Sequence, residues 1–237
     1  MCGIAGFLGR HGPREVLERR LQRMNLALRH RGPDSHGAWC DLDHGVGLAH
    51  TRLAIVDLSP AGHQPMFSED GSLALIYNGE VYNFAAVRAE LEAAGLAPAS
   101  GWRGHSDTEI ILAAVSAWGL EPALQRFVGM FAMALWDRRD ASLTLVRDRL
   151  GIKPLYYGLA GASLIFGSEL KALRGHEDFS PRVDREARGL YFRYAYVPAP
   201  WSIYEGVRKL EPGAWLRVTA QDVASRRLPE PTRWWSL

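Results

Sequence analysis

Apolar residues recur at steps of three and four along part of the chain, which is the pattern of an amphipathic helix. The clearest case follows Pro13, a residue suited to a first helical turn, and places Leu17, Leu21, Met24 and Leu28 on one face. The same spacing, closed by glycines in two cases, predicts helices over residues 13–31, 84–94, 107–118 and 121–127.

Short runs rich in branched and aromatic residues lie between these helices and are bounded by turn residues, as β-strands are. These runs cover residues 4–8, 46–50, 73–77, 130–137, 143–147, 155–157 and 164–166. They cluster on both sides of a helical middle instead of alternating with single helices, so the pattern favours mostly antiparallel sheets with helices packed on them. The predicted fold class is α+β, in a layered sandwich.

The end of the chain has a different character. From Ala220 the sequence is polar and punctuated by prolines, which is typical of a linker or tail. Trp234 and Trp235 close this run with no evident core to enter.

Composition narrows the classes of protein. The 237 residues are 47% hydrophobic and 23% charged, as in globular domains, and the net charge of +2 gives no basic surplus for nucleic acid. No apolar run approaches the roughly 20 residues of a membrane-spanning helix, and no secretory signal follows Met1, so we expect a cytoplasmic protein. Two cysteines, Cys2 and Cys40, are too few for a disulfide framework or a four-ligand zinc site.

Cys2 is the first candidate for chemistry. Removal of Met1 would give it a free α-amine, whose ordinary pKa of about 7.7–8 suits a base that takes the thiol proton. Gly3 and Gly6 follow within a predicted strand and leave room for close approach. The alternative is a small residue at position two whose thiol is simply buried as a hydrophobe.

Asn78 and Gly79 follow a predicted apolar strand. An amide side chain and a glycine N–H at this place could point at one oxyanion. The competing interpretation is a hairpin turn, because Asn-Gly is the strongest short turn signal.

Two charged residues complete the candidate set. Asp107 follows Ser106, which with Glu109 has the spacing of a capping box that does not need Asp107. A carboxylate in the first helical turn is stabilised by the helix dipole, but it could equally face a substrate ammonium. Arg52 lies in an apolar run, where a guanidinium needs a carboxylate, either from a substrate or from an internal salt bridge. A nucleophile, an oxyanion site, a cation and an anion together suit an amino acid with a side-chain amide, such as glutamine.

Longer motifs then carry a resemblance. The chain contains MCGIAGF at its start, RHRGPDSHG at 29–37, HTRLAIVDLSPAGHQPM at 50–66, YNGEVYNF at 77–84, SDTE at 106–109, GMFAMALWD at 129–137, RDRLGIKPLYYG at 147–158, FGSELKAL at 166–173 and YVPAPWSIYEGVRKLEPG at 196–213. In this order the motifs resemble class II glutamine amidotransferases, specifically the amino-terminal glutaminase half of glutamine-hydrolysing asparagine synthetases.

The resemblance implies an amino-terminal-nucleophile (Ntn) hydrolase fold, a four-layer αββα sandwich of two antiparallel sheets between helical layers. It implies Cys2 as nucleophile and Asn78 with Gly79 as oxyanion hole. The glutamine contacts that it implies are Arg52, Ile55, Val56, Glu80 and Asp107. It places the glutaminase domain at residues 1–215 and a linker at 216–237.

The implied reaction is hydrolysis of L-glutamine to glutamate and ammonia, with no cofactor or metal. ATP and magnesium would serve only a synthetase domain, whose Ser-Gly-Gly-x-Asp-Ser loop does not occur in this sequence, so the synthetase step is not expected here. A synthetase domain or chain is the expected partner, and a homodimer stays open.

Other interpretations of the same residues stay open. The fold could serve as a catalytically silent partner-binding or regulatory module, or the nucleophile could act on another amide. His30, His50, His63 and His105 lack metal-ligand spacing and are expected to be structural. We expect the Arg147-Asp148-Arg149 run to be a structural ion-pair element.

Overall fold

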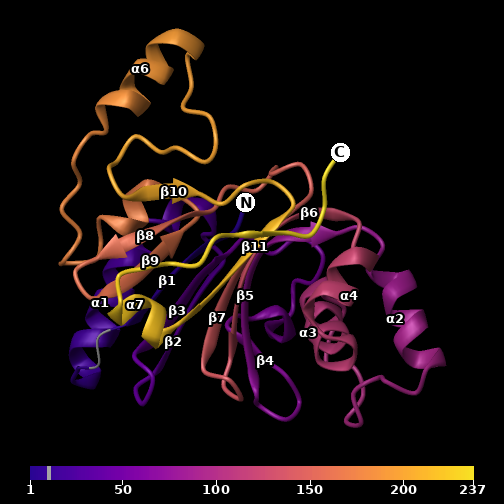
Figure 1. Cartoon of the computed structure of the whole chain (residues 1–237). Coiled ribbons are helices and arrows are strands. Elements are labelled where there is room, and N and C mark those ends of the chain that lie inside the picture. The colour runs from indigo at the N-terminus through magenta and orange to yellow at the C-terminus, as the bar shows by residue number, and fades with distance from the viewer. Residues whose placement is uncertain (10–11) are drawn as a thin grey trace.

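Two antiparallel β-sheets lie face to face at the centre of the molecule (Figure 1). The computed structural model describes residues 1–9 and 12–237, and in this part of the chain each sheet has six strands. The first sheet, in the order β10-β8-β9-β1-β3-β2, consists of β1 (Gly3–Gly9), β2 (Ser35–Asp41), β3 (Val46–Arg52), β8 (Tyr156–Ala160), β9 (Ser163–Gly167) and β10 (Val207–Lys209). The second, in the order β12-β11-β7-β6-β5-β4, consists of β4 (Met66–Phe67), β5 (Leu73–Val81), β6 (Gly129–Asp137), β7 (Ser142–Arg147), β11 (Ala214–Thr219) and β12 (Thr232–Arg233).

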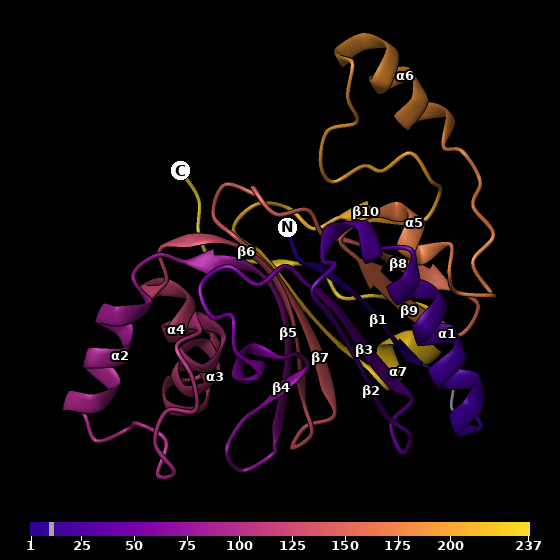
Figure 2. The same cartoon turned by 180° about the vertical axis from the view of Figure 1, so that it is seen from behind.

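Helices cover the outer face of each sheet, as the two opposite views show (Figures 1 and 2). The first sheet carries α1 (Arg14–Leu26) and α5 (Leu170–Leu173), and the second carries α2 (Phe84–Ala93), α3 (Asp107–Trp118) and α4 (Leu120–Arg126). Helix α7 (Ala220–Ala224) follows β11, while α6 (Arg185–Tyr194) projects from the sandwich (Figure 1). The predicted four-layer αββα arrangement is confirmed.

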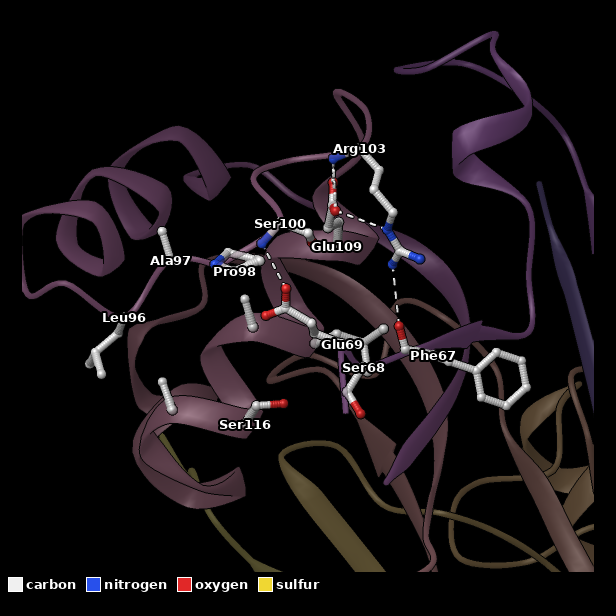
Figure 3. A pocket seen from close by; sticks show the side chains of 13 residues that line it. Phe67, Ser68, Glu69, Leu96, Ala97, Pro98, Ser100, Arg103, Glu109 and Ser116 are labelled. Carbon is white, nitrogen blue, oxygen red and sulfur yellow. Dashed lines mark hydrogen bonds and ion pairs between the residues drawn. The ribbon is translucent and has the colours of Figure 1, made fainter. Parts of the chain in front are cut away.

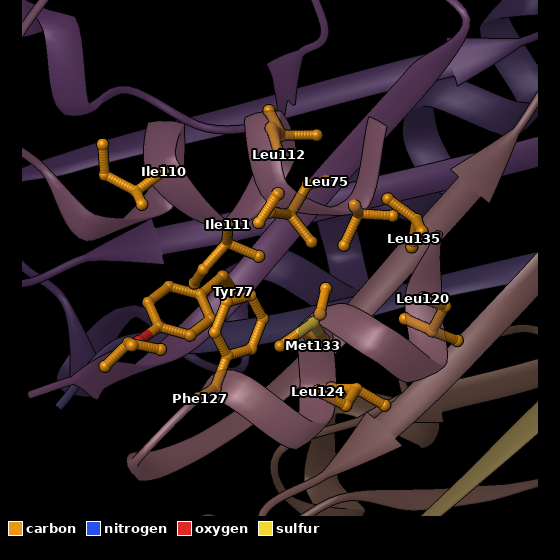
Figure 4. Packing of buried hydrophobic residues seen from close by; sticks show 14 of the residues in the cluster. Leu75, Tyr77, Ile110, Ile111, Leu112, Leu120, Leu124, Phe127, Met133 and Leu135 are labelled. Carbon is orange, nitrogen blue, oxygen red and sulfur yellow. The ribbon is translucent and has the colours of Figure 1, made fainter. Parts of the chain in front are cut away.

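Three apolar clusters hold these layers together. The first fills the space between the sheets and includes Ile4, Ile76 and Trp136, all fully buried. The other two lie beneath the helices, and Figure 4 shows residues of α3 and α4 packed on Tyr77 and Met133 of the second sheet. Burying each large apolar side chain stabilises the fold by about 1.5–3 kcal/mol. Because successive side chains of a strand point to opposite faces, the apolar residues of each strand divide between the inner cluster and the cluster beneath the helices.

The first predicted helix is shorter than its apolar spacing indicated. Helix α1 ends at Leu26, and residues Arg29–Arg31 form a separate 3-10 turn. The chain must cross the end of β3 here, because the carbonyl oxygen of Leu28 accepts a hydrogen bond from Thr51 Oγ1 at 3.3 Å. Tertiary contact therefore overrides the helical periodicity over the last residues of 13–31.

The turn weighed against the oxyanion interpretation of Asn78-Gly79 and the capping box at Ser106 are both contradicted by the structure. Asn78 and Gly79 form no turn but continue β5, opposite Ala132 and Phe131 of β6. No capping box forms at α3, since the Ser106 side chain makes no cap bond and Glu109 instead accepts hydrogen bonds from the N–H groups of Arg103 and Gly104 at 2.9 and 3.2 Å.

The terminal segment also differs from the linker expected at 216–237. Strand β11 crosses the boundary at residue 215 and pairs with β7 along its length. Trp234 is 7% exposed, stacks on Phe131 with ring centroids 6.2 Å apart, and accepts a hydrogen bond at its carbonyl oxygen from Gln125 Nε2 at 2.7 Å. The core that Trp234 enters is formed by strands distant in sequence, which local composition does not reveal.

Candidate active site

Cys2 lies at the start of β1, beside the end of β3. The Leu53 N–H donates to its Sγ at 3.4 Å, and the thiol lies 3.6 Å from the Leu53 carbonyl oxygen. A Cβ on Gly3 would stand 2.6 Å from Thr51 Oγ1, so only glycine allows β1 to lie this close to β3. The glycine noted beside Cys2 therefore places the thiol against the last residues of β3.

The backbone of Cys2 is held by a buried arginine. Arg31 Nε donates to the Cys2 carbonyl oxygen at 2.8 Å, and Arg31 Nη1 donates to Glu169 Oε1 at 2.7 Å. Burial disfavours the charge on Glu169, but hydrogen bonds from Arg31, Lys171 and His30 lower its pKa to about 2. The carboxylate thus stays charged near neutral pH, and the amino terminus is fixed through Arg31.

The thiol opens on a cavity of about 300 Å³ between the two sheets and the start of α3. All eight predicted site residues line it: Cys2, Arg52, Ile55, Val56, Asn78, Gly79, Glu80 and Asp107. Ile55 and Val56 are 70% and 41% exposed, which places them at the mouth, while Asn78 and Asp107 are buried. The fold therefore brings together residues from four separate parts of the sequence.

Asn78 offers an unused hydrogen-bond donor. Its side chain is 1% exposed, and among the described residues its Nδ2 has no partner. Ile76, two residues earlier in β5, lies in the cluster between the sheets, so Asn78 faces the same way, toward the sheet that carries Cys2. A buried N–H without a partner costs about 1–3 kcal/mol, and this cost is typical of a group that a ligand completes.

The Gly79 N–H points to the same cavity. Its neighbours at alternate positions, Tyr77 and Val81, donate their N–H groups to Gln64 Oε1 at 2.6 Å and Asp107 Oδ2 at 2.9 Å, on the side of β5 away from β6. Alternate N–H groups of a strand point to the same side, so the Gly79 N–H lies between these two bonds. A side chain here is excluded, because a Cβ would stand 2.7 Å from Phe131 Cα.

Asp107 is fixed by its neighbours. Its Oδ2 accepts a hydrogen bond from Tyr77 Oη at 2.7 Å as well as the one from Val81. Burial and the nearby charge of Glu80 raise the pKa of Asp107 above its ordinary value, although both hydrogen bonds act to lower it. Burial and the charge of Asp107 likewise raise the pKa of Tyr77. A buried carboxylate whose charge is poorly compensated suits a substrate ammonium.

Within the part of the chain that the structure describes, Arg52 does not form the internal salt bridge considered as an alternative. Its guanidinium donates to the backbone carbonyl oxygens of Ser59, at 2.8 Å, and of Asp57. The positive charge is therefore held at the cavity by neutral groups and stays available to a substrate carboxylate.

Several residues that were not predicted as site residues also line this cavity, among them Gln64, Tyr77, Met130 and Lys153. Tyr77 directly precedes Asn78 in the sequence, but nothing in the sequence indicated that its hydroxyl donates a hydrogen bond to Asp107. His50, expected to be structural, is buried with Nε2 3.1 Å from the Tyr77 carbonyl oxygen, and burial lowers its pKa to about 3. It therefore stands neutral behind the strand that carries the site.

A larger cavity, of about 500 Å³, lies at the far side of α3 (Figure 3). Its polar groups bond to each other: Glu69 accepts from the N–H groups of Ala99 and Ser100 at 2.9 and 2.7 Å, and Glu109 holds Arg103. No cysteine is among the described residues that line it, and its carboxylates are already paired, so size alone does not mark the candidate reactive site. In the described residues no group of three or more His, Cys, Asp or Glu could hold a metal, and no helix is long and apolar enough to cross a membrane.

Comparison with known proteins agrees with this geometry. Asparagine synthetase [glutamine-hydrolyzing] 1 of Bacillus subtilis is 37% identical over 216 residues, covering 90% of this chain and 33% of the relative. A putative asparagine synthetase [glutamine-hydrolyzing] of Methanocaldococcus jannaschii is 36% identical over 229 residues, covering 89% of this chain and 42% of the relative. The chain thus spans well under half the length of these relatives.

The fold has a counterpart among solved structures. The glutamine phosphoribosylpyrophosphate amidotransferase of B. subtilis superposes with a TM-score of 0.69 at 19% identity, over 98% of this chain and 49% of that one. The sequence model of the glutamine amidotransferase domain matches residues 1–235. The chain therefore belongs to the glutamine amidotransferase domain family.

Proposed function

We propose that this chain hydrolyses L-glutamine to glutamate and ammonia through a thioester on Cys2. The observation that carries the proposal is the convergence of the Cys2 thiol, the unpartnered Asn78 amide and the Gly79 N–H on one cavity that also holds Arg52 and Asp107. Family membership supports the same chemistry.

The first half-reaction forms the thioester. After removal of Met1, the Cys2 α-amine takes the thiol proton and Sγ bonds to the side-chain amide carbon. The resulting oxyanion accepts hydrogen bonds from Asn78 Nδ2 and the Gly79 N–H. The amide nitrogen then takes the proton from the α-ammonium, the carbon–nitrogen bond breaks and ammonia leaves.

The second half-reaction restores the thiol. A water molecule gives a proton to the α-amine and adds to the thioester carbon, through an oxyanion at the same two donors. The carbon–sulfur bond breaks, the sulfur regains its proton and glutamate is released. We propose that the chain's own groups serve both steps without a cofactor.

Substrate selection follows from the charges of the cavity. Arg52 would bind the α-carboxylate and Asp107, with Glu80, the α-ammonium of a free amino acid, while Ile55 and Val56 would cover its stem at the mouth. We further propose that the ammonia serves an ATP- and magnesium-dependent synthetase domain, in line with the names of the relatives.

The test is release of glutamate from glutamine by the pure chain. Wild type should turn over, while Cys2→Ala should fall to background, and intact mass should show Met1 absent from the active fraction. A glutamine-mimicking electrophile should label Cys2, and glutamine should block the labelling. Turnover equal to that of Cys2→Ala would leave a silent binding module as the better interpretation. Activity in molecules that retain Met1 would instead refute the Cys2 α-amine as the base.

A further inference from the structure

A buried lysine in the cavity has no assigned role. Lys153 is 6% exposed and lines the cavity together with Cys2, Asn78 and Gly79. Within residues 1–9 and 12–237, no hydrogen bond or ion pair to Lys153 Nζ is seen. Lys153 Nζ is not among the buried nitrogens without a partner, so the ammonium faces the open cavity, where it can attract an anion that is present only when the site is occupied.

The backbone of Lys153 is fixed by two buried charged side chains. Arg147 donates to the carbonyl oxygens of Lys153, Gly151 and Leu210 at 2.9, 2.7 and 2.6 Å. Asp148 accepts from the N–H groups of Ile152 and Lys153, both at 2.9 Å. The structural role expected of Arg147 and Asp148 is confirmed, but in residues 1–9 and 12–237 it rests on hydrogen bonds to backbone groups of the loop that ends at Lys153, not on an ion pair between the two side chains.

The same carboxylate places Lys153 beside the oxyanion donors. Asp148 Oδ2 accepts from both the Lys153 N–H and the Phe131 N–H, the latter at 3.1 Å. Phe131 is the residue of β6 opposite Gly79, and Ala132 is opposite Asn78. The lysine thus enters the cavity from a loop that Asp148 attaches to β6, the strand next to the two proposed donors, whereas Asp107 enters it from the start of α3.

The charges around Lys153 indicate what it would meet. The other charged or titratable side chains that line the cavity are Cys2, Arg52, Asp57, Tyr77, Glu80 and Asp107. Asp57 is held by the N–H groups of Ser59 and His105, at 2.7 and 2.9 Å. A zwitterionic amino acid needs one cation and one anionic side, for which Arg52 and the pair Asp107 and Glu80 suffice, so substrate binding does not require Lys153.

We infer that Lys153 is a catalytic residue whose ammonium stabilises the negative charge on Cys2 Sγ and on the tetrahedral oxyanion. The role in turnover rests on the proposed glutamine hydrolysis. A cation in a water-poor site acts on developing charge far more strongly than it does in bulk water, and its fixed backbone removes the need to reorganise.

The experiment measures Cys2 without glutamine and then with it. The rate of Cys2 carboxamidomethylation by iodoacetamide is followed against pH by peptide mass, with Cys40 as the internal reference because burial raises the pKa of its thiol to about 11. Compared with wild type, Lys153→Met should move the midpoint of the Cys2 rate profile upward by about one pH unit, and Lys153→Arg should keep it near the original value. Arg19→Met, which removes one positive charge from the exposed face of α1, should leave the midpoint unchanged.

Turnover supplies the second measurement. Lys153→Met should lower kcat about 100-fold with little change in KM, while Lys153→Arg should retain most of kcat. An unchanged midpoint in Lys153→Met, or a loss confined to KM, would overturn the inference and make Lys153 a substrate anchor. If Lys153→Met does not fold, Lys153→Gln replaces it. Failure of the wild type to release glutamate refutes glutamine hydrolysis alone, because the alkylation profile still decides the role of Lys153 toward the thiolate.

Discussion

Replacement of Asn78 by alanine should separate activity from stability. The side-chain Nδ2 is buried without a partner in the described structure, so the folded chain already bears the cost of desolvating it, about 1–3 kcal/mol. Asn78→Ala removes that cost but also loses the packing of the amide. We expect the two effects to offset each other, with a change in Tm within about 4 °C.

The effect on catalysis should be large and in one direction. Loss of one oxyanion donor costs about 100- to 1,000-fold in kcat, which corresponds to roughly 2.7–4 kcal/mol of transition-state stabilisation. Asn78→Asp should lose more, because it places a carboxylate where negative charge develops. Glutamate release at saturating glutamine gives kcat, and circular dichroism gives Tm.

Asn83→Ala is the matched control. Its amide is satisfied on both sides, with Nδ2 donating to the Arg126 carbonyl oxygen and Oδ1 accepting from the Val128 N–H, both at 2.9 Å, and it lies outside the cavity. This variant should lower Tm and leave kcat unchanged, the opposite of Asn78→Ala. A kcat for Asn78→Ala within threefold of wild type, or a fall in Tm as large as that of Asn83→Ala, would refute the reasoning.

The remaining predictions concern the same strand and its surroundings. Gly79→Ala should lower stability by about 1–3 kcal/mol and abolish turnover, since the added Cβ meets the β6 backbone; a normal melting curve would contradict it. Asp107→Asn should lower kcat/KM for glutamine about 10- to 150-fold, mainly through KM, and unchanged kinetics would show that the carboxylate does not bind the ammonium. Because burial lowers the pKa of His50 to about 3, the unfolded chain binds a proton below about pH 6.5 that the folded chain excludes. Stability should therefore fall by up to about 1.4 kcal/mol per pH unit from pH 6.5 toward pH 3, and urea unfolding of His50→Gln should show a shallower fall.

The sequence pattern alone indicated which residues share an apolar face. Helical spacing identified α2, α3 and α4 to within a residue or two, because local periodicity reflects which face is buried. Runs of branched and aromatic residues marked seven of the twelve described strands, while β2, β4, β10, β11 and β12 were not predicted. Cys2, Arg52 and Asp107, which the motifs singled out, lie in the lining of one cavity.

Pairing partners decided the rest. Local preference favours a turn at Asn78-Gly79. Only the pairing with Phe131 and Ala132 extends β5 through these residues and places them in the cavity that Cys2 also lines. Trp234 looked unplaced because its partner Phe131 is remote in sequence. Nothing local indicated that the side chain of Lys153 enters the cavity. Its position depends on hydrogen bonds from Arg147 and to Asp148 that fix the backbone of one loop. Periodicity reports burial along a segment, whereas the direction in which a buried polar group points depends on segments that only folding brings together.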